Sequence, residues 1–439
     1  MMAEQMMQGA ADKTIPAGYK QTEVGVIPQD WNVSMLRDIS SKITDGTHDT
    51  PKPVIEGIPF LTAIHVKDGK IDFDGCYFLP ESIHNEIYRR CNPEFGDILM
   101  VNIGSGTATT AVVNVDYEFS LKNVALIKPN KENNGFYINY ALSFSKNKII
   151  DTILTGGAQP FLSLTQIALL QVPVPSREEQ TTIANVLSDS DALIGALEQL
   201  IAKKQAIKTA TMQQLLTGRT RLPQFALRPD GTPKGYKSSE LGQIPEDWES
   251  VDFGNIAKPS ASRINPKMSG GGDICIELEH ISSGTGTLLG ETTTNRTSSL
   301  KSIFEPGDVL FGKLRAYLKK YILADFYGVC STEVWVLKSD VNLATSEYIY
   351  SIVQSERFIN AASEAYGTHM PRADWSVVKY FPVMLPSTVE QTAIATILSD
   401  MDSELTALQQ KLAKARSLKQ GMMQQLLTGR IRLPLPQEA

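Results

Sequence analysis

The chain has 439 residues, of which 42% are hydrophobic and 21% are charged, and this fits two or three globular domains. Its formal net charge of −6 argues against a protein that coats nucleic acid with its whole surface, but it leaves local basic patches open. No apolar run reaches the roughly 20 residues that a membrane-spanning helix needs. We therefore expect a protein that binds no membrane. The 4 cysteines lack C-x-x-C spacing, which fits a protein of the reducing cytoplasm.

The first residues predict a disordered leader, and a recognisable phrase follows them. Residues 1–17 include Glu4 and have neither the basic start nor the apolar core of a signal peptide. Residues 18–31 then contain G-Y-K and G-V-I-P-Q-D-W. The same phrase returns as G-Y-K and G-Q-I-P-E-D-W in residues 235–248, about 217 residues later. The repeat indicates that a second unit starts there.

A longer repeat closes each unit. Residues 179–223 return as residues 390–434, about 211 residues later, with roughly 26 of the 45 positions identical and no gap. Apolar residues at spacings of three and four predict a helix of about 38 residues in each copy, roughly 57 Å long. Gly218 and Gly429, in the two L-L-T-G sequences, are expected to end these helices in the left-handed conformation.

A helix of this length with one apolar stripe needs a partner helix. The nearest candidate is the other copy, because pairing within one chain costs no association entropy. We therefore expect an antiparallel coiled coil that gives the chain approximate twofold symmetry. The residues expected to pair the helices are Leu187, Ile194, Leu197, Ile201, Leu398, Leu405, Leu408 and Leu412.

Between lead-in and helix the two units differ in sequence but keep common landmarks. Short apolar runs separated by Gly, Asn and Asp predict short strands in an α+β domain. G-D-I-L in residues 96–99 corresponds to G-D-V-L in residues 307–310, which indicates a shared scaffold. The predicted order is a leader (1–17), a first domain (18–175), a first helix (176–222), a linker (223–234), a second domain (235–386), a second helix (387–433) and a tail (434–439).

Signatures of catalysis are missing. The chain has no G-x-x-x-x-G-K-[ST] phosphate loop and no H-E-x-x-H, and its 5 histidines are scattered. N-P-E-F in residues 92–95 differs from an amino-methyltransferase N-P-P-[FY] loop by its glutamate, and a turn before the next strand is the better interpretation. We therefore expect no catalytic residue, no metal site and no bound cofactor in this chain.

Four segments carry side chains that suit nucleic acid. Each also has an ordinary interpretation, namely a surface turn, a glycine-rich strand end, a solvated strand face or a structural turn. Their corresponding places in two duplicated domains favour the nucleic-acid interpretation. The candidate contacts are Thr47, His48 and Lys52 in the turn 45–52, Asn102, Ser105 and Thr107 in the glycine-rich segment 102–107, Lys313, Arg315, Tyr317, Lys319 and Lys320 in the basic run 313–320, and His369 and Arg372 in the segment 367–372.

The motifs together resemble the specificity subunit of type I restriction-modification enzymes. They are two lead-ins G-x-I-P-x-[DE]-W, two G-D-[IV]-L sequences, and two helices that open with P-x-x-x-E-Q-x-x-I-A and close with Q-Q-L-L-T-G. D-G-T-H in residues 45–48 and G-D-V-L-F-G-K-L-R in residues 307–315 are similar to sequences common in target recognition domains of that family. The resemblance covers residues 18–434, and the departure from it is that the first domain lacks the basic strand of the second.

The resemblance implies an α+β fold with two target recognition domains in tandem, each followed by a long helix. Each domain would read one half of a bipartite, asymmetric sequence of double-stranded DNA, and the paired helices would set the spacer. It also implies two methyltransferase subunits that use S-adenosylmethionine and, through them, restriction subunits that use ATP and Mg. The chain would serve host defence against foreign DNA as a non-catalytic subunit.

Three other functions remain open from the sequence. A self-sufficient nuclease or methyltransferase conflicts with the missing motifs. A coiled-coil adaptor without a DNA role leaves the divergence of the two domains unexplained. A recognition subunit of a different restriction system differs from the main interpretation only in its partners.

Overall fold

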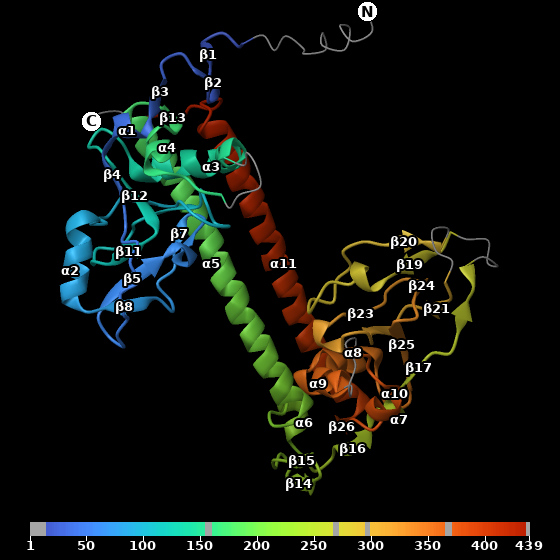
Figure 1. Cartoon of the computed structure of the whole chain (residues 1–439). Helices are drawn as coiled ribbons and strands as arrows, with labels where there is room; N and C mark the ends of the chain where they lie inside the picture. The colour runs from blue at the N-terminus through green and yellow to red at the C-terminus, as the bar shows by residue number, and fades with distance from the viewer. Residues whose placement is uncertain (1–14, 154–159, 267–271, 295–298, 365–370, 436–439) are drawn as a thin grey trace, which may run out of the picture. The chain divides into compact units, whose positions relative to one another are not determined.

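The chain divides into two compact units. The computed structural model describes residues 15–153, 160–266, 272–294, 299–364 and 371–435, so the expectations for the leader and the tail lie mostly outside it. Unit 1 contains Met1–Ala196 and Ala413–Ala439, and unit 2 contains Leu197–Leu412. Two long helices, α5 (Arg177–Leu216) and α11 (Thr388–Leu426), contribute residues to both units (Figure 1).

Unit 1 is built on an antiparallel sheet with the strand order β10-β9-β12-β4. In β9, Ile98 and Met100 pack in the core that includes helix α3, whereas Leu99 and Val101 pack in the core shared with the sheet β11-β5-β8. The elements are β1 (Tyr19–Thr22), β2 (Gly25–Pro28), β3 (Asn32–Met35), α1 (Leu36–Ile39), β4 (Ser40–Asp45), β5 (Ile58–Thr62), η1 (Ala63–His65), β6 (Val66–Lys67), β7 (Lys70–Ile71), β8 (Tyr77–Leu79), α2 (Glu81–Arg90), β9 (Ile98–Val101), β10 (Thr110–Val112), β11 (Ser120–Lys122), β12 (Val124–Pro129), α3 (Gly135–Ile153), α4 (Leu164–Ala168) and β13 (Gln171–Val174).

Unit 2 repeats this plan with the strand order β17-β25-β22-β23. In β22, Val309 and Phe311 pack with helices α8 and α9, whereas Leu310 packs in the second core. The elements are α6 (Pro223–Ala226), β14 (Tyr236–Ser239), β15 (Gly242–Pro245), β16 (Glu249–Asp252), α7 (Phe253–Ile256), β17 (Ala257–Pro259), β18 (Arg263–Ile264), β19 (Ile274–Ile276), η3 (Leu278–His280), β20 (Thr292–Thr293), β21 (Lys301–Phe304), β22 (Val309–Gly312), η5 (Ala316–Leu318), β23 (Tyr321–Leu323), β24 (Gly328–Ser331), β25 (Val334–Ser339), α8 (Ser346–Gln354), α9 (Glu356–Ser363), α10 (Trp375–Val378) and β26 (Pro382–Leu385).

The long helices pair antiparallel inside each unit, which confirms the predicted fold class. In unit 2, Lys204 Nζ lies 2.7 Å from Glu404 Oε1, and Lys208, one turn further along α5, binds Asp402, which precedes Glu404 in α11. In unit 1, Lys419 Nζ lies 2.6 Å from Asp191 Oδ1. Both helices end at the expected Leu-Leu sequence, because Gly218 and Gly429 have φ of +65°.

The residues expected to pair the helices are buried to different degrees. Leu187 packs in one core with Leu426, and Leu398 packs in another with Met212 and Leu215. Leu405 and Leu408 are also buried, whereas Ile194, Leu197, Ile201 and Leu412 are half-buried. Packing is therefore tightest where each globular domain covers the helices.

In unit 1 the repeated lead-in meets the end of α11. Tyr19 donates its hydroxyl hydrogen to the carbonyl oxygen of Gly429 at 2.9 Å. A Cβ at position 429 would lie 2.4 Å from Cγ of Pro28, so only glycine fits beside the lead-in proline. Trp31 Nε1 donates to Glu179 Oε2 at 3.1 Å, and Arg432 binds both Glu179 and Asp30. We call Asp30, Trp31, Glu179 and Arg432 the unit 1 junction.

Unit 2 contains the same junction, made from a different part of the chain. Tyr236 donates to the carbonyl oxygen of Gly218 at 3.2 Å, and Trp248 Nε1 donates to Glu390 Oε2 at 3.0 Å. Arg221 binds Glu390 and Asp247, each at 2.8 Å or less. Asp247, Trp248, Glu390 and Arg221 form the unit 2 junction. Each repeated lead-in thus contacts the end of one long helix. In unit 1 these two contacting segments come from opposite ends of the sequence.

Candidate nucleic-acid interface

In unit 1 the glycine-rich segment is the connection between β9 and β10. Gly104 has φ of +96° and Ala108 has φ of +67°, so the loop turns twice through the left-handed region. The amide of Gly104 donates to the carbonyl oxygen of Pro160 at 3.1 Å, and the amide of Leu162 donates to that of Asn102 at 2.8 Å. Residues 102–109 and 160–162 are therefore held together as one pair of loops.

The side chains of this loop divide into buried and exposed groups. Asn102 is 5% exposed and Thr107 is 2% exposed, and the Thr107 hydroxyl donates to the carbonyl oxygen of Gly104 at 2.7 Å. Their burial favours a supporting role over the nucleic-acid contact predicted for them. The exposed side chains are Ser105, Ile103 and Phe161, and the sequence interpretation missed the last two because they are apolar.

Unit 2 has the same pair of loops between β22 and β23. Arg315 has φ of +53° and Lys319 has φ of +51°, at the positions that correspond to Gly104 and Ala108. The amide of Arg315 donates to the carbonyl oxygen of Pro371 at 2.8 Å, and the amide of Ala373 donates to that of Lys313 at 2.8 Å. The glycine-rich segment and the basic run, which look unrelated in sequence, are thus the same structural element. We call residues 102–109 with 160–162, and residues 313–320 with 371–373, the paired loops.

The cations of the unit 2 paired loops are not equivalent. Lys320 Nζ donates to the carbonyl oxygens of Leu278 and Ile281 at 2.6 and 2.9 Å, so its ammonium is satisfied by the protein. Arg372 Nε donates to Glu333 Oε2 at 2.9 Å. Arg315 and the half-exposed Tyr317 make no side-chain hydrogen bond to any residue that the structure describes. These two side chains are free to meet a ligand.

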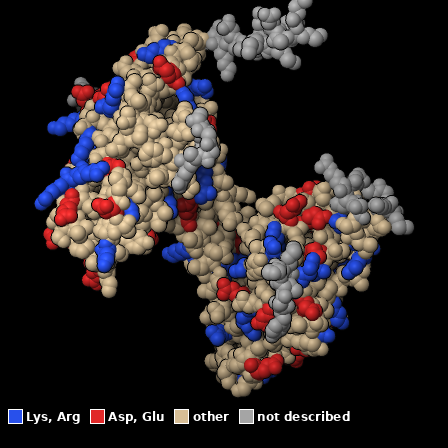
Figure 2. Space-filling model, viewed as in Figure 1, with Lys and Arg blue, Asp and Glu red and all other residues tan. Residues whose placement is uncertain are grey.

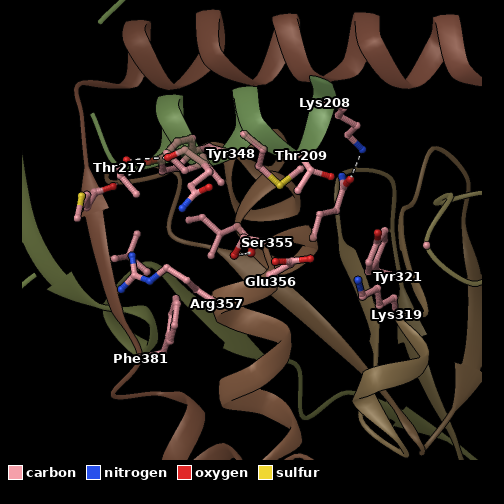
Figure 3. Close-up of a pocket in the computed structure, with 18 of the residues that line it drawn as sticks. Lys208, Thr209, Thr217, Lys319, Tyr321, Tyr348, Ser355, Glu356, Arg357 and Phe381 are labelled. Carbon is pink, nitrogen blue, oxygen red and sulfur yellow. Dashed lines mark hydrogen bonds between the residues drawn. The ribbon is translucent and has the colours of Figure 1, made fainter. Parts of the chain in front are cut away.

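Behind the unit 2 paired loops lies a cavity of about 450 Å³. The loop 283–285 borders it, and the amide of Gly284 donates to the carbonyl oxygen of Lys319 at 2.8 Å. Figure 3 shows Lys319 and Tyr321 at one end of the cavity and Arg357 with Phe381 at the other. Lys208 closes one side from α5 and donates to Gln354 Oε1 at 2.7 Å. The hydrogen bond from Gly284 thus holds the loop around Lys319 against the loop 283–285.

The turn 45–52 forms a polar cluster where β4 ends and β12 begins. His48 Nε2 lies 3.0 Å from Asp45 Oδ2, and Nδ1 lies 2.8 Å from Asn123 Oδ1. A Cβ at position 46 would lie 2.0 Å from the carbonyl oxygen of Leu121, which explains the glycine of D-G-T-H. Lys52 is exposed, whereas Thr47 is half-buried and its hydroxyl accepts a hydrogen bond from the amide of Asp49 at 3.1 Å.

The remaining expectations concern His369, metal binding and membrane-spanning helices. His369 lies outside the described residues. Within the described ranges no group of three or more His, Cys, Asp and Glu is arranged to hold a metal ion, and no helix is long and apolar enough to cross a membrane. On the face drawn in Figure 2, basic and acidic side chains are interspersed over each unit.

Two α+β domains with the same paired loops, each followed by a helix of about 40 residues, define a duplicated protein whose two units present different side chains on one backbone frame. The family model described as the type I restriction modification DNA specificity domain matches residues 28–209 and 245–415. The chain therefore belongs to the specificity subunits of type I restriction-modification enzymes.

Named relatives and a solved structure are similar to this chain over 63% to 94% of its length. The chain is 27% identical over 435 residues to the putative type I restriction enzyme MjaX specificity subunit of Methanocaldococcus jannaschii, covering 94% of this chain and 97% of that one. It is 26% identical over 295 residues to the type I restriction enzyme EcoDI specificity subunit of Escherichia coli, covering 63% and 66%. The crystal structure of the S subunit from M. genitalium shares the fold, with a TM-score of 0.58, 13% identity and coverage of 93% and 97%.

Proposed function

We propose that each globular domain reads one half of a bipartite, asymmetric DNA sequence. One observation carries the proposal: the paired loops have the same backbone hydrogen bonds in both units but present different side chains. Two dissimilar half-sites require the same backbone in both units with different side chains on it. The arrangement of half-sites on DNA follows the arrangement of the protein units that read them.

The contacts that we propose are local, because the net charge of the chain is −6. In unit 2, Arg315 and Lys313 reach phosphates or base edges, and Tyr317 packs on sugar or base. In unit 1, His48, Lys52 and Ser105 are the exposed polar candidates. Partner subunits supply further cations, since phosphate neutralisation dominates the affinity for DNA.

The paired helices set the spacer between the half-sites. With 40 and 39 residues, α5 and α11 each extend for about 60 Å. Ion pairs in each unit, such as Lys204 with Glu404 and Lys419 with Asp191, fix the register of one helix against the other. Because the register is fixed, the helices determine the number of base pairs in the DNA spacer.

The chain directs chemistry that its partners perform. The relatives are specificity subunits of restriction enzymes, which supports a complex with two methyltransferase subunits and, through them, with restriction subunits. S-adenosylmethionine, ATP and Mg bind to those partners, and this chain binds none of them. The specificity subunit thereby selects one target for both methylation and restriction.

The test is to co-express the chain with its methyltransferase subunit and to map methylated adenines across a genome by single-molecule sequencing. We expect one bipartite motif with a constant spacer, and no methylation when either chain is expressed alone. Methylation of one contiguous motif, or none from a well-formed complex, would overturn the proposal and would favour a recognition subunit of a different system.

A further inference from the structure

The backbone of the paired loops allows a position-by-position comparison of the two units. The amide that anchors each loop belongs to Gly104 in unit 1 and to Arg315 in unit 2, and each donates to a proline carbonyl oxygen, at 3.1 and 2.8 Å. Isolated bridges join Ile103 to Phe161 and Leu314 to Arg372. The corresponding positions, unit 1 first, are Ile103 and Leu314, Gly104 and Arg315, Ser105 and Ala316, Gly106 and Tyr317, Thr107 and Leu318, Ala108 and Lys319, and Phe161 and Arg372.

In unit 2, Arg315 is the position where a free guanidinium sits on a fixed backbone. Its amide is held by Pro371, and its side chain is exposed without a hydrogen-bond partner among the described residues. Arg372, across the bridge, already donates through Nε to Glu333. Arg315 adopts a left-handed backbone, with φ of +53°, that glycine adopts more readily.

In unit 1 the positions that correspond to Leu314, Arg315 and Arg372 carry no cationic residue. Gly104 has no side chain to project, and the pair beside it is Ile103, which is 42% exposed, and Phe161, which is 50% exposed. Both are apolar, and they lie opposite each other across the bridge between the loops. Ser105 adds one exposed hydroxyl group.

We propose that the paired loops determine which bases each half-site contains: Arg315 of unit 2 reads a guanine, and Ile103 with Phe161 of unit 1 reads a thymine methyl group. The inference rests on the proposed function and adds the base class to it. Guanine presents N7 and O6 to a guanidinium in the major groove, and the C5 methyl of thymine is the apolar group there. The same frame thus reads a hydrogen-bonding edge in one half-site and an apolar one in the other.

Arg315→Gly tests the unit 2 assignment without adding strain, because glycine adopts φ of +53° freely. The variant is co-expressed with the methyltransferase subunit, and methylated sites are mapped as for the wild type. We expect discrimination at one G·C pair of one half-site to fall about tenfold or more, while the other half-site and the spacer stay the same. Arg315→Lys, which keeps the charge but loses the fork, is expected to relax the same base pair.

Phe161→Ala tests the unit 1 assignment and identifies the other half-site. We expect it to relax an A·T pair in the half-site that Arg315→Gly leaves unchanged. Lys411→Ala, which removes an exposed charge from α11, is the matched control and keeps the whole motif. Size-exclusion chromatography shows whether each variant still forms the complex with the methyltransferase subunit and is therefore folded.

The outcomes separate the two proposals. If the wild type methylates a bipartite motif but Arg315→Gly keeps full discrimination, or relaxes a base pair other than G·C, the assignment of guanine is wrong and the proposed function stands. Relaxation of the same half-site by Arg315→Gly and Phe161→Ala would also refute the inference. If the wild type shows no bipartite motif, the proposed function fails and the inference fails with it.

Discussion

Asp247 is the most exposed member of the unit 2 junction, and its ionisation is coupled to folding. Burial acts to raise the pKa of this carboxyl group, but hydrogen bonds from Arg221 and Lys234 outweigh it, and the pKa falls from 3.8 to about 2. A carboxyl group whose pKa is lower in the folded state stabilises the fold above its unfolded pKa. That contribution is lost as the pH falls through the folded pKa.

This coupling predicts a pH dependence between about pH 4 and about pH 2. We expect Asp247→Asn to lower the urea midpoint of unfolding above about pH 4, and the two midpoints to converge as the pH falls further. Parallel curves over the whole range would show that Asp247 carries no linked proton. Asp325→Asn is the matched control, because Asp325 is an exposed carboxyl group of unit 2.

Arg315 gives a second prediction, on DNA affinity instead of stability. In the complex with the methyltransferase subunit, we expect Arg315→Ala to weaken binding and to make the slope of log K against log salt shallower by about 1. The physical reason is that one fewer counterion is released from DNA. Fluorescence anisotropy over a salt series measures both values, with Lys411→Ala as the control. Unchanged affinity and slope would remove Arg315 from the interface.

Single residues were only partly predictable from the sequence. Residue type alone selected Arg315 and Tyr317, which the structure leaves exposed. It also selected Asn102 and Thr107, which are buried, because polar side chains serve a loop as often as a ligand. Phe161 escaped notice since an apolar residue predicts a core, and only the bridge to Ile103 shows its place.

At the scale of elements, α5 and α11 are joined in unit 2 by an ion pair with little access to water. The Lys208 side chain is 4% exposed and that of Asp402 is 26% exposed. Burial raises the pKa of Asp402 despite the neighbouring ammonium. The cost of removing both charges from water thus offsets much of their attraction.

A double-mutant cycle follows from this balance. We expect Lys208→Met alone to destabilise unit 2 by about 3 kcal/mol, because Asp402 is left without its partner. Lys208→Met with Asp402→Leu is expected to recover most of the loss. The urea midpoint of the unit 2 transition measures each step. If the double variant is as unstable as the single one, the pair is a net stabiliser and the argument from burial fails.

The sequence was most informative about the helices and least about the strands. An apolar stripe over some 40 residues, closed by Leu-Leu-Thr-Gly, predicts both a helix and its end, since spacing and a left-handed glycine are local signals. The strands β9 and β22 were recognisable by G-D-[IV]-L. The sequence placed residues 102–107 and the basic run at corresponding positions, but it did not indicate that Gly104 and Arg315 share a left-handed backbone, because their identities differ so much.

At the scale of the whole molecule, the proposed spacing role predicts the effect of lengthening both helices. Seven residues inserted after Leu200 and seven after Gln410 preserve the apolar register and add about 10 Å. We expect the preferred spacer to grow by about three base pairs, with both half-sites unchanged. Methylation mapping gives the new motif. An unchanged spacer would refute the proposed spacing role of the helices. An insertion in α5 alone, which leaves the two helices unequal in length, serves as the control.

Truncation tests how unit 1 is assembled. A chain that ends at Leu412 lacks Lys419, Leu426 and Arg432, which contact Asp191, the core around Leu187 and the unit 1 junction. We expect limited proteolysis to cut unit 1 throughout while unit 2 stays resistant. The single substitution Arg432→Ala should weaken unit 1 without unfolding it. Equal resistance of both units in the truncated chain would contradict this division.

This division could not be predicted from the repeats. They start and end with whole domains and whole helices, so they suggest units in linear order. The structure instead divides both long helices between the units, since long-range contacts such as Arg432 with Asp30 decide the partition. Periodicity reports what a segment packs with locally, and it contains no information about which distant copy completes a cluster.

The discontinuous unit 1 has a consequence for biosynthesis. Glu179 and Arg432 are 253 residues apart, so at about 5–20 residues per second the ribosome needs roughly 13–50 s between them. During that interval the side chains that will meet the end of α11, such as Leu187, have no partner helix to cover them. Unit 2, which is one continuous stretch, can be completed meanwhile. The domain that leaves the ribosome first is thus the last to finish folding.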